Sequence, residues 1–481
     1  MTHAPILLWF RRDLRLHDNA ALQAALQTGR PLIPIFIRDG LIENLGAAPS
    51  WRLGQGLDAL SGRLGDVGGR LVLRSGPVMT VLKALIAETG ATSVMWNRLH
   101  DPAARARDEV VKQSLKALGI EARSFSGQYL VDPWQIATGA GTPFRVFTPF
   151  WRALQQQEIP APLSAPTRLP APEVWPESEA LEAWALGRAM QRGAAVLERH
   201  VRVGEAAALD RLSEFRHDGL AAYPDRRDIP GAPGTSRLSA ALSLGEISPR
   251  QCWHAIMAEE AAGNSGASAF LRQLAWRDFA GHLLFHDGAL PDRCWRPEWE
   301  DFPWNRSGDT PEVLAWKQGR TGVPFVDAAM REMQVTGTMH NRARMIAASY
   351  LTKHLLTDWR IGERWFAEHL VDFDAASNAM GWQWVAGCGP DASPYFRIFN
   401  PETQKQKFDP QGQYTTAWIA EMSPDPSPLA LEVFEALPRS WNMSPEDAYP
   451  DPVVGLPEGR ARALAAYESF RDRSGSDSAA G

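Results

Sequence analysis

Short apolar runs alternate with longer amphipathic stretches over the first 130 residues of the chain. Four of the runs have the length and the side chains of buried strands; they cover residues 5–10, 31–37, 70–73 and 93–96. The stretches between them are long enough for helices. Because such alternation is typical of parallel strands joined by crossover helices, we predict a doubly wound α/β domain with a parallel sheet over residues 1–130.

A Pro- and Ala-rich stretch at residues 157–180 interrupts this pattern. Proline and alanine without apolar periodicity are typical of a connecting segment that runs over the surface. We therefore expect an interdomain linker over residues 131–203. The last residues, 471–481, are mostly small and polar, and we expect a flexible tail there.

Apolar residues recur at helical spacing from about residue 204 onward. The first of them are Ala208, Leu212 and Phe215. Ser248 followed by Pro249 is a typical helix start, because a hydroxyl caps the first turn and proline suits its first position. Strand-like runs are scarce in this part of the chain. The pattern predicts a large all-α domain over residues 204–470.

Composition excludes several classes of protein. No run approaches the roughly 18 apolar residues of a transmembrane helix, and the apolar stretch before Arg11 and Arg12 is too short for a signal peptide. We therefore expect a cytoplasmic protein. Three widely spaced cysteines are too few for a four-cysteine iron–sulfur cluster and fit a reducing compartment. The net charge of −6 does not indicate nucleic-acid binding, although a local basic groove matters more.

The segment from residue 372 to residue 384 concentrates chemically useful side chains. It places two carboxylates, an amide and two tryptophans within thirteen residues: Asp372, Asp374, Asn378, Trp382 and Trp384. Two tryptophans at i and i+2 point to different sides of a local segment, so one ring can face an internal cofactor relay and the other a surface cavity. The segment predicts redox chemistry beside a stacking platform.

Two other segments have both a functional and a purely structural interpretation. Residues 234–239 form a turn with small hydroxyl side chains that suits a diphosphate, although alone it is better explained as a helix cap. Gln273, Trp276 and Arg277 share one helical face. An amide, an indole and a guanidinium suit a flat heteroaromatic ligand with carbonyl edges, or else an aromatic core position with polar neighbours.

A pair of arginines and a pair of histidines also have both a functional and a structural interpretation. Arg342 and Arg344 lie on different sides of a helix, where one can meet phosphate and the other a buried carboxylate such as Asp372. Two solvated arginines are the simpler interpretation. His282 and His286 have a metal-capable spacing, but nearby carboxylates are not organised around them, so we expect no metal site.

Taken together, these segments resemble the DNA photolyase/cryptochrome family. The likeness covers nearly the whole chain and includes LWFRRDLRLHDN at residues 8–19, GTSRLS at 234–239, MHNR at 339–342 and PYFRIFNP at 394–401. The pairing of Trp276 with Trp384 is most similar to a class I cyclobutane pyrimidine dimer photolyase. The resemblance implies an α/β N-terminal domain followed by a helical domain that binds FAD in a folded conformation.

By similarity, one group of residues lines the adenosine and diphosphate end of FAD. Its members are Tyr223, Thr235, Ser236, Arg237, Leu238 and Ser239. Around the isoalloxazine ring the resemblance places Arg344, paired with Asp372, and Asn378 near flavin N5, where a neutral amide hydrogen-bonds without imposing charge. The remaining implied cofactor contacts are Asp374, Arg277 and Asn341.

The resemblance also implies an electron relay and a DNA-binding surface. Trp382, Trp359 and Trp304 match the relay, in which the hole moves outward from the flavin to solvent. Trp276 and Trp384 match residues that flank a lesion flipped out of UV-damaged DNA. The implied contacts to DNA around the lesion are Arg226, Arg342, Arg397 and Gln404.

The implied reaction is light-driven repair of cyclobutane pyrimidine dimers. Excited, fully reduced FAD donates an electron to the dimer, the ring splits, and the electron returns. Gln273, a catalytic and lesion-contacting position, departs from the family pattern because dimer photolyases carry Glu there. The amide can still donate a hydrogen bond but cannot supply a proton, so we expect weaker repair.

Two other functions stay open. A cryptochrome-type blue-light photoreceptor with little or no repair is favoured by Gln273, whereas Trp384 and the very short tail favour the enzyme. An electron-transfer flavoprotein that does not bind DNA leaves Trp276, Trp384 and Arg397 unexplained. We expect a monomer, with methenyltetrahydrofolate as a possible second, antenna chromophore in the N-terminal domain.

Overall fold

A computed structural model of the chain describes residues 4–392 and 396–477. It divides into two compact units. The sheet unit comprises Met1–Ala189, Arg202–Ala221 and Ser236–Gly288, and the helical unit comprises Met190–Val201, Ala222–Thr235 and Ala289–Gly481. Both units therefore draw on separated segments, whereas the sequence analysis expected domains that follow one another along the chain.

Five parallel strands form the sheet, in the order β3-β2-β1-β4-β5. They are β1 (Ile6–Phe10), β2 (Leu32–Arg38), β3 (Val72–Ser75), β4 (Ser93–Asn97) and β5 (Glu121–Phe125). The first four confirm the predicted strands. The apolar pattern did not predict β5, because three of the five residues of this edge strand are polar and only Ala122 is buried.

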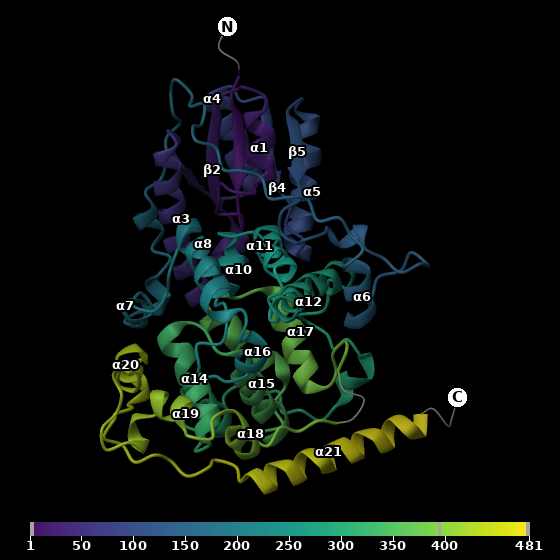
Figure 1. The fold of residues 1–481 in the computed structure, drawn as a ribbon, viewed down its shortest axis with the longest axis vertical. Coiled ribbons are helices and arrows are strands. Elements are labelled where there is room, and N and C mark those ends of the chain that lie inside the picture. The colour runs from purple at the N-terminus through teal and green to yellow at the C-terminus, as the bar shows by residue number, and fades with distance from the viewer. Residues whose placement is uncertain (1–3, 393–395, 478–481) are drawn as a thin grey trace. The chain divides into compact units, whose positions relative to one another are not determined.

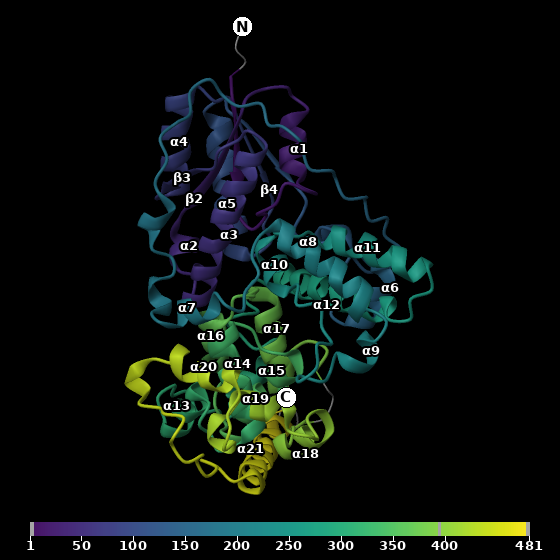
Figure 2. The same cartoon turned by 60° about the vertical axis from the view of Figure 1, so that its left-hand side comes forward.

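Helices cover both faces of the sheet, which confirms the doubly wound α/β class (Figures 1 and 2). Alternate residues of β1 enter different cores: Leu8 and Phe10 pack with α1 (Ala20–Leu26) and α3 (Ala47–Asp66). Leu7 and Trp9 pack with the helices of the opposite face, α4 (Val78–Thr89) and α5 (Pro102–Ala117). A strand with both faces covered is apolar at every position, as this one is in sequence.

The rest of the sheet unit is mainly helical. Ser248 caps α11 by accepting from the backbone N–H of Gln251 at 3.0 Å, as its sequence predicts. The remaining elements that lie wholly in this unit are α2 (Gly40–Glu43), η1 (Pro133–Gln135), α6 (Phe147–Leu154), η2 (Leu181–Trp184), α8 (Glu205–Glu214), η4 (Phe215–Gly219), α10 (Ser239–Leu244), α11 (Pro249–Ala261) and α12 (Ala267–His286).

The Pro-rich stretch at residues 157–180 contains no helix or strand and lies against the sheet unit. Its Pro170 carbonyl accepts from the N–H of Leu32 at 2.8 Å, and the N–H of Glu179 donates to the carbonyl of Leu73 at 2.9 Å. These bonds use backbone groups at β2 and β3. The stretch is therefore anchored along this unit rather than a free connection.

The helical unit confirms the expected helical character of the second half of the chain. Its elements are α7 (Gly193–Leu197), α9 (Tyr223–Arg226), η5 (Pro297–Asp301), α13 (Pro311–Gln318), α14 (Pro324–Thr336), α15 (Asn341–Ser349), η6 (Tyr350–His354), α16 (Trp359–His369), α17 (Ala375–Ala386), α18 (Pro401–Phe408), α19 (Gln413–Trp418), η7 (Ala420–Met422), α20 (Pro428–Ala436), η8 (Arg439–Trp441) and α21 (Leu456–Asp477). A short turn, η3 (Arg188–Met190), lies where the chain passes between the units. Helix α21 continues seven residues into the expected flexible tail, and residues 478–481 of that tail lie outside the described part.

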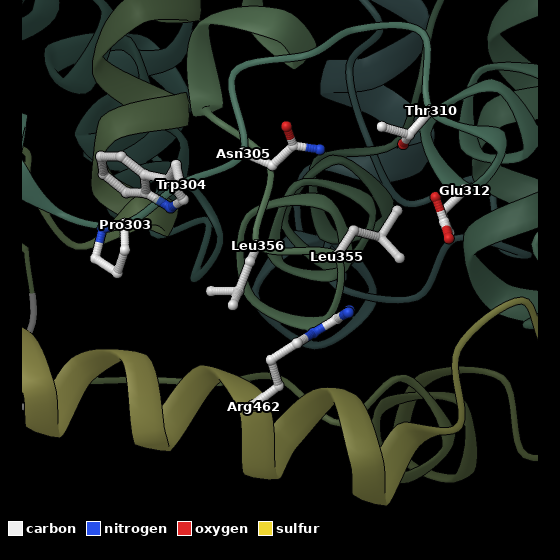
Figure 3. A pocket seen from close by; sticks show the side chains of 8 residues that line it. All are labelled: Pro303, Trp304, Asn305, Thr310, Glu312, Leu355, Leu356 and Arg462. Carbon is white, nitrogen blue, oxygen red and sulfur yellow. The ribbon is translucent and has the colours of Figure 1, made fainter.

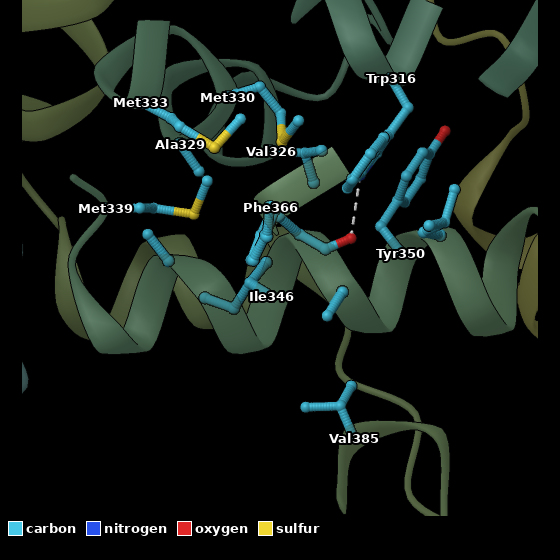
Figure 4. Close-up of a cluster of buried hydrophobic side chains, with 14 of the residues drawn as sticks. Trp316, Val326, Ala329, Met330, Met333, Met339, Ile346, Tyr350, Phe366 and Val385 are labelled. Atoms are coloured by element: carbon cyan, nitrogen blue, oxygen red, sulfur yellow. Dashed lines mark hydrogen bonds between the residues drawn. The ribbon is translucent and has the colours of Figure 1, made fainter. Parts of the chain in front are cut away.

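A large apolar core holds the helical unit together (Figure 4). Side chains from α14, α15 and α16 meet there, and Trp316 of α13 donates its indole N–H to the carbonyl of Ala347 at 3.0 Å. A buried indole needs such an acceptor, so the bond fixes the ring orientation as well as satisfying the donor. Within the described residues, no helix is both long and apolar enough to span a membrane.

Candidate functional site

Helices α16 and α17 pack tightly because residue 362 has no side chain. The ring of Trp382 occupies the position that a Cβ at Gly362 would take, and Leu351 would lie 2.7 Å from that Cβ. Gly362 follows Trp359 by one helical turn, so the Trp382 ring lies on the helix that begins at Trp359. Two of the three predicted relay tryptophans are thereby brought onto neighbouring helices.

The third relay tryptophan, Trp304, lies on a segment that pairs with the start of α16. Asn305 forms an isolated parallel bridge with Thr357, and its carbonyl accepts from the N–H of Asp358 at 2.8 Å. The Trp304 indole N–H donates to the carbonyl of Thr352 at 3.3 Å. Together with Glu312 and Arg462, Trp304 lines a cavity of about 430 Å³ (Figure 3).

Between the two tryptophans of α17, Gln383 is fully buried and uses its whole amide. Its Nε2 donates to the carbonyls of Leu290 and Arg293 at 2.6 and 2.9 Å, and its Oε1 accepts from the N–H of Trp295 at 2.7 Å. Sequence reasoning named Trp382 and Trp384 but missed this residue. Its type and its position between them were visible, but its partners lie about 90 residues away in sequence.

The predicted pair of Arg344 and Asp372 is present, with Arg344 Nη2 2.7 Å from Asp372 Oδ2. The second carboxylate oxygen, Oδ1, is buried and has no hydrogen-bond partner. An unpartnered buried acceptor is costly, by about 1–3 kcal/mol, unless a ligand donor meets it. The N–H of a flavin ring is such a donor, so these residues fit the expected cofactor.

The predicted N5 neighbour, Asn378, is held by a residue that sequence reasoning missed. Asn378 Nδ2 donates to Glu363 Oε1 at 2.8 Å and to the Glu363 carbonyl at 3.0 Å. Both amide hydrogens are thus used, which leaves Oδ1 as the free acceptor of the side chain. Burial raises the pKa of Glu363 to about 7, and the bond from Asn378 only partly offsets it.

The other predicted cofactor residues of the helical unit have ordinary local roles. Asp374 caps α17 by accepting from the N–H of Ser377 at 2.9 Å. Tyr223 is buried, which raises its pKa, and Asn341 lies in the first turn of α15, where its amide donates to the Met345 sulfur. Thr235 is half-buried. Their contacts to a cofactor stay predictions.

The predicted diphosphate turn crosses from one unit to the other in sequence. A Cβ at Gly234 would overlap the carbonyl of Arg226, so only glycine fits this approach. In the sheet unit Ser236 is half-buried, Leu238 is buried, and Arg237 and Ser239 are exposed. Arg237 has a φ of 51°, which is uncommon for a residue with a side chain and is a form of local strain found at ligand sites.

The predicted lesion face of α12 also lies in the sheet unit. Trp276 stacks on Phe147, with ring centroids 3.7 Å apart and planes 7° from parallel, and Gln273 is half-buried. The Arg277 guanidinium donates to the carbonyls of Gln128 and Leu242 at 2.9 and 3.3 Å. Arg277 therefore organises backbone within this unit, and its contact to the cofactor stays a prediction.

The remaining predicted DNA contacts lie in the helical unit. Arg342 forms an ion pair with Asp228 at 2.9 Å. Its guanidinium is therefore not free for a phosphate group, as the predicted DNA contact would require. Trp384 is partly exposed and donates to the carbonyl of Asp391 at 3.0 Å, and the Arg397 guanidinium lies 5.7 Å from its ring centroid. Other predicted contacts are Arg226, exposed on α9, and Gln404, half-buried on α18.

The two histidines of α12 contact the backbone around them. His282 and His286 both contact the carbonyl of Pro133, and the N–H of Phe144 bonds to His282 Nε2 at 3.0 Å. Among the described residues, no group of three or more His, Cys, Asp or Glu side chains is arranged to hold a metal ion.

Comparison with known proteins identifies the class and then the family. Residues 270–469 match the FAD binding domain of DNA photolyase and residues 6–173 match the DNA photolyase model, so the chain is a flavoprotein by its domains. It is 46% identical to a deoxyribodipyrimidine photo-lyase of Agrobacterium fabrum, over 97% of this chain and 98% of that one. The chain belongs to the DNA photolyase/cryptochrome family.

Two further relatives bear on the subclass. A crystal structure from Agrobacterium tumefaciens, described as a bacterial class III photolyase, is 45% identical with a TM-score of 0.90 and covers 98% of each chain. Cryptochrome-1 of Arabidopsis thaliana is 33% identical over 95% of this chain and 69% of its own length. The class III description does not agree with the expected class I assignment.

Replacing Gly362 with alanine should disturb the packing of α16 on α17. We expect the G362A variant to lose about 1–3 kcal/mol of unfolding free energy, because the Trp382 ring must move. The matched control is Gly381→Ala in α17, where a Cβ meets nothing within 4 Å and which should gain up to about 1 kcal/mol. Urea unfolding followed by tryptophan fluorescence measures both; equal effects would contradict this account of the contact.

Asp278 should make stability depend on pH. It accepts from the N–H of Leu130 at 2.7 Å, and burial raises its pKa to about 7. Between about pH 4 and pH 7 the native state then binds more protons than the unfolded state, so stability falls as pH rises. Against Asp278→Asn, which keeps the acceptor, wild type should lose on the order of a few kcal/mol between pH 5 and pH 8.

Denaturant unfolding of both proteins at the two pH values measures this difference. A gap between wild type and D278N that is the same at pH 5 and pH 8 would show that Asp278 is ionised throughout.

Proposed function

We propose that this protein repairs cyclobutane pyrimidine dimers in UV-damaged DNA in a light-driven reaction with FAD. The observation that carries the proposal is the match, over nearly the full length of both chains, to relatives named deoxyribodipyrimidine photo-lyase. The arrangement of Arg344, Asp372 and Asn378 supports it, because these residues offer a flat redox cofactor both donors and acceptors.

Within the helical unit, we assign the ring end of FAD to Asp372 and Asn378. Asp372 Oδ1 would accept from a ring N–H, while Arg344 holds the same carboxylate from its other oxygen. Asn378 would offer Oδ1, since Glu363 already holds its amide hydrogens. When bound, FAD supplies light-driven one-electron transfer. The chain's own residues orient the ring and set the charge beside it.

Trp382, Trp359 and Trp304 are proposed as the electron relay. The Trp382 ring lies against Gly362, and the segments that carry Trp359 and Trp304 are joined by the Asn305–Thr357 bridge. Indoles are oxidisable and large, so successive edges stay close within a packed core. The cavity beside Trp304 gives the last indole a route to solvent.

For the DNA, stacking and charge are proposed to act together. Trp384 is partly exposed under the Arg397 guanidinium, and Trp276 is held flat by Phe147. Stacking of an unpaired base on an aromatic side chain contributes roughly 1–3 kcal/mol of binding free energy. Arg226, Arg397 and Gln404 are proposed to meet the backbone around the lesion. To contact a DNA phosphate, the Arg342 guanidinium would have to bind it alongside the Asp228 carboxylate.

Several finer assignments are also part of the proposal. Identity of 45–46% with the Agrobacterium relatives favours class III over class I. A second antenna chromophore, with methenyltetrahydrofolate as the candidate, a monomeric state and a cytoplasmic location are proposed as well. The three cysteines are free thiols, which is consistent with a reducing compartment.

Repair of a dimer-containing oligonucleotide tests the function and the role of Gln273. Reduced protein under blue light should remove cyclobutane dimers, while darkness and a (6-4) lesion serve as controls. A Gln273→Glu variant should repair several-fold faster, because a carboxyl group can supply a proton that the amide cannot. Loss of dimers is measured by chromatography of the product strand.

If neither lesion is repaired although FAD is bound and reducible by light, the photolyase proposal fails and a photoreceptor function stands. Repair that is unchanged in Q273E would keep the function and remove Gln273 from its proposed role.

Trp384 should contribute to damaged DNA specifically. We expect Trp384→Ala to weaken binding of dimer-containing duplex by about 1–3 kcal/mol, roughly 5- to 150-fold, through lost stacking. Trp384→Phe, which keeps an aromatic face, should lose much less. Fluorescence anisotropy measures both at one fixed salt concentration. An equal loss on undamaged duplex would mean that Trp384 contacts the backbone rather than the lesion.

A further inference from the structure

The buried indole of Trp359 donates its hydrogen bond to sulfur. Its Nε1–H lies 3.4 Å from the Sγ of Cys294, and both side chains are buried. Thiols are weak acceptors compared with backbone carbonyls. They are also easily oxidised, which a carbonyl is not. The middle tryptophan of the proposed relay therefore touches a potential electron donor.

A second thiol lies beside the first. Cys388 is fully buried and its side chain interacts with that of Cys294, while its Sγ–H donates to the Gln383 carbonyl at 3.9 Å. Gln383 fixes this arrangement, because its Oε1 accepts from the N–H of Trp295 at 2.7 Å and lies 3.7 Å from Cys388 Sγ. The backbone N–H of Trp295, which follows Cys294, and the Sγ of Cys388 thus contact the same buried oxygen, Gln383 Oε1. The two cysteines are far apart in sequence but held together by the fold.

We infer that Cys294 and Cys388 form a redox-active dithiol that donates two electrons to the relay through Trp359 and becomes a disulfide. The inference rests on the electron relay of the proposed function. It adds to that relay an internal reductant that can supply two electrons, and a pair of cysteines that becomes oxidised to a disulfide. The dithiol delivers one pair of electrons and then needs an external thiol to be reduced again.

The step is balanced in atoms and electrons. A one-electron oxidised Trp359 indole, produced by the light-driven relay, takes one electron from Cys294, and a second such event takes another from the sulfur pair. The two S–H bonds break, the Cys294 Sγ–Cys388 Sγ bond forms, and two protons leave. Trp359 returns to its reduced state each time, so it acts as a conductor and is not consumed.

Two groups next to the sulfur pair can accept these protons. Glu300 hydrogen-bonds to the backbone N–H of Cys294 at 2.6 Å and is partly exposed, so it connects that thiol to water. Lys353 is buried and donates to the carbonyl of Ala386 at 2.5 Å, next to the turn that carries Cys388. Burial lowers the pKa of Lys353 to about 7, so a neutral amine is accessible there at neutral pH.

Cys294 differs from an ordinary buried cysteine of the same chain, whereas burial raises the pKa of Cys388 well above its usual range. Cys252 lies in the sheet unit, and burial raises its pKa to about 12. The pKa of Cys294 is instead lowered, because its sulfur interacts with the Cys388 side chain and accepts from the Trp359 N–H. Cys252 therefore serves as the internal reference for a thiol that should not react.

Counting thiols before and after illumination tests the inference. Protein purified with its FAD is illuminated with blue light, without oxygen and without added reductant, then denatured in acid and alkylated. Mass spectrometry should find three alkylated cysteines in the dark sample. After light it should find only Cys252 alkylated and a disulfide-linked peptide pair containing Cys294 and Cys388. Trp359→Phe protein and protein stripped of FAD should keep three thiols.

The outcomes separate this inference from the function on which it rests. If the flavin absorbance shows that electrons were accepted while all three thiols survive, the dithiol is not the donor and the relay stands. If light fails to change the flavin even with an external thiol present, the relay itself fails and the inference fails with it. A light-induced disulfide that persists in Trp359→Phe would also overturn it, because the electrons would bypass the indole.

Discussion

The arrangement of the helical unit depends on one buried amide. Gln383 is fully buried, and leaving an amide unsatisfied there costs about 1–3 kcal/mol, so its bonds to Leu290, Arg293 and Trp295 fix the rotation of α17. Neighbouring positions on a helix point about 100° apart. With Gln383 held against the 290–295 segment, Trp382 is directed into the core and Trp384 towards a partly exposed edge. The opposite roles of the two rings follow from the residue between them.

Two carboxylates near the proposed flavin site are treated differently by their surroundings. Asp372 has a guanidinium partner, whereas Glu363 has only an amide partner, and burial raises its pKa to about 7. The carboxylate of Asp372 lies against the guanidinium of Arg344, so the two opposite charges offset each other. Glu363 next to Asn378 can change protonation near neutral pH. The helical unit thus places an ion pair and, on α16, a carboxyl group with a raised pKa near the proposed flavin site.

Sequence patterns were sufficient for features that depend on neighbours in the chain. Four of the five strands and the start of α11 follow from apolar runs and a Ser–Pro cap, whereas the pairing of Arg344 with Asp372 was implied by the family resemblance. The edge strand β5 was missed because most of its residues are polar and it lacks the apolar run of a buried strand. Glu363, Phe147 and Gly362 were missed for another reason: each acts through a side chain brought close only by tertiary packing, and nothing in its local sequence distinguishes it.

Trp359 differs from two other buried indoles of the helical unit in its hydrogen-bond acceptor. Trp316 and Trp304 donate to backbone carbonyls, which every helix offers and which cannot be oxidised under biological conditions. Trp359 donates to Cys294, although a carbonyl would be the stronger acceptor. Packing alone requires only that the indole N–H be satisfied, and it is indifferent to the redox chemistry of the acceptor. A sulfur at this position, with a second sulfur beside it, therefore gives the relay a property that the stability of the fold does not require.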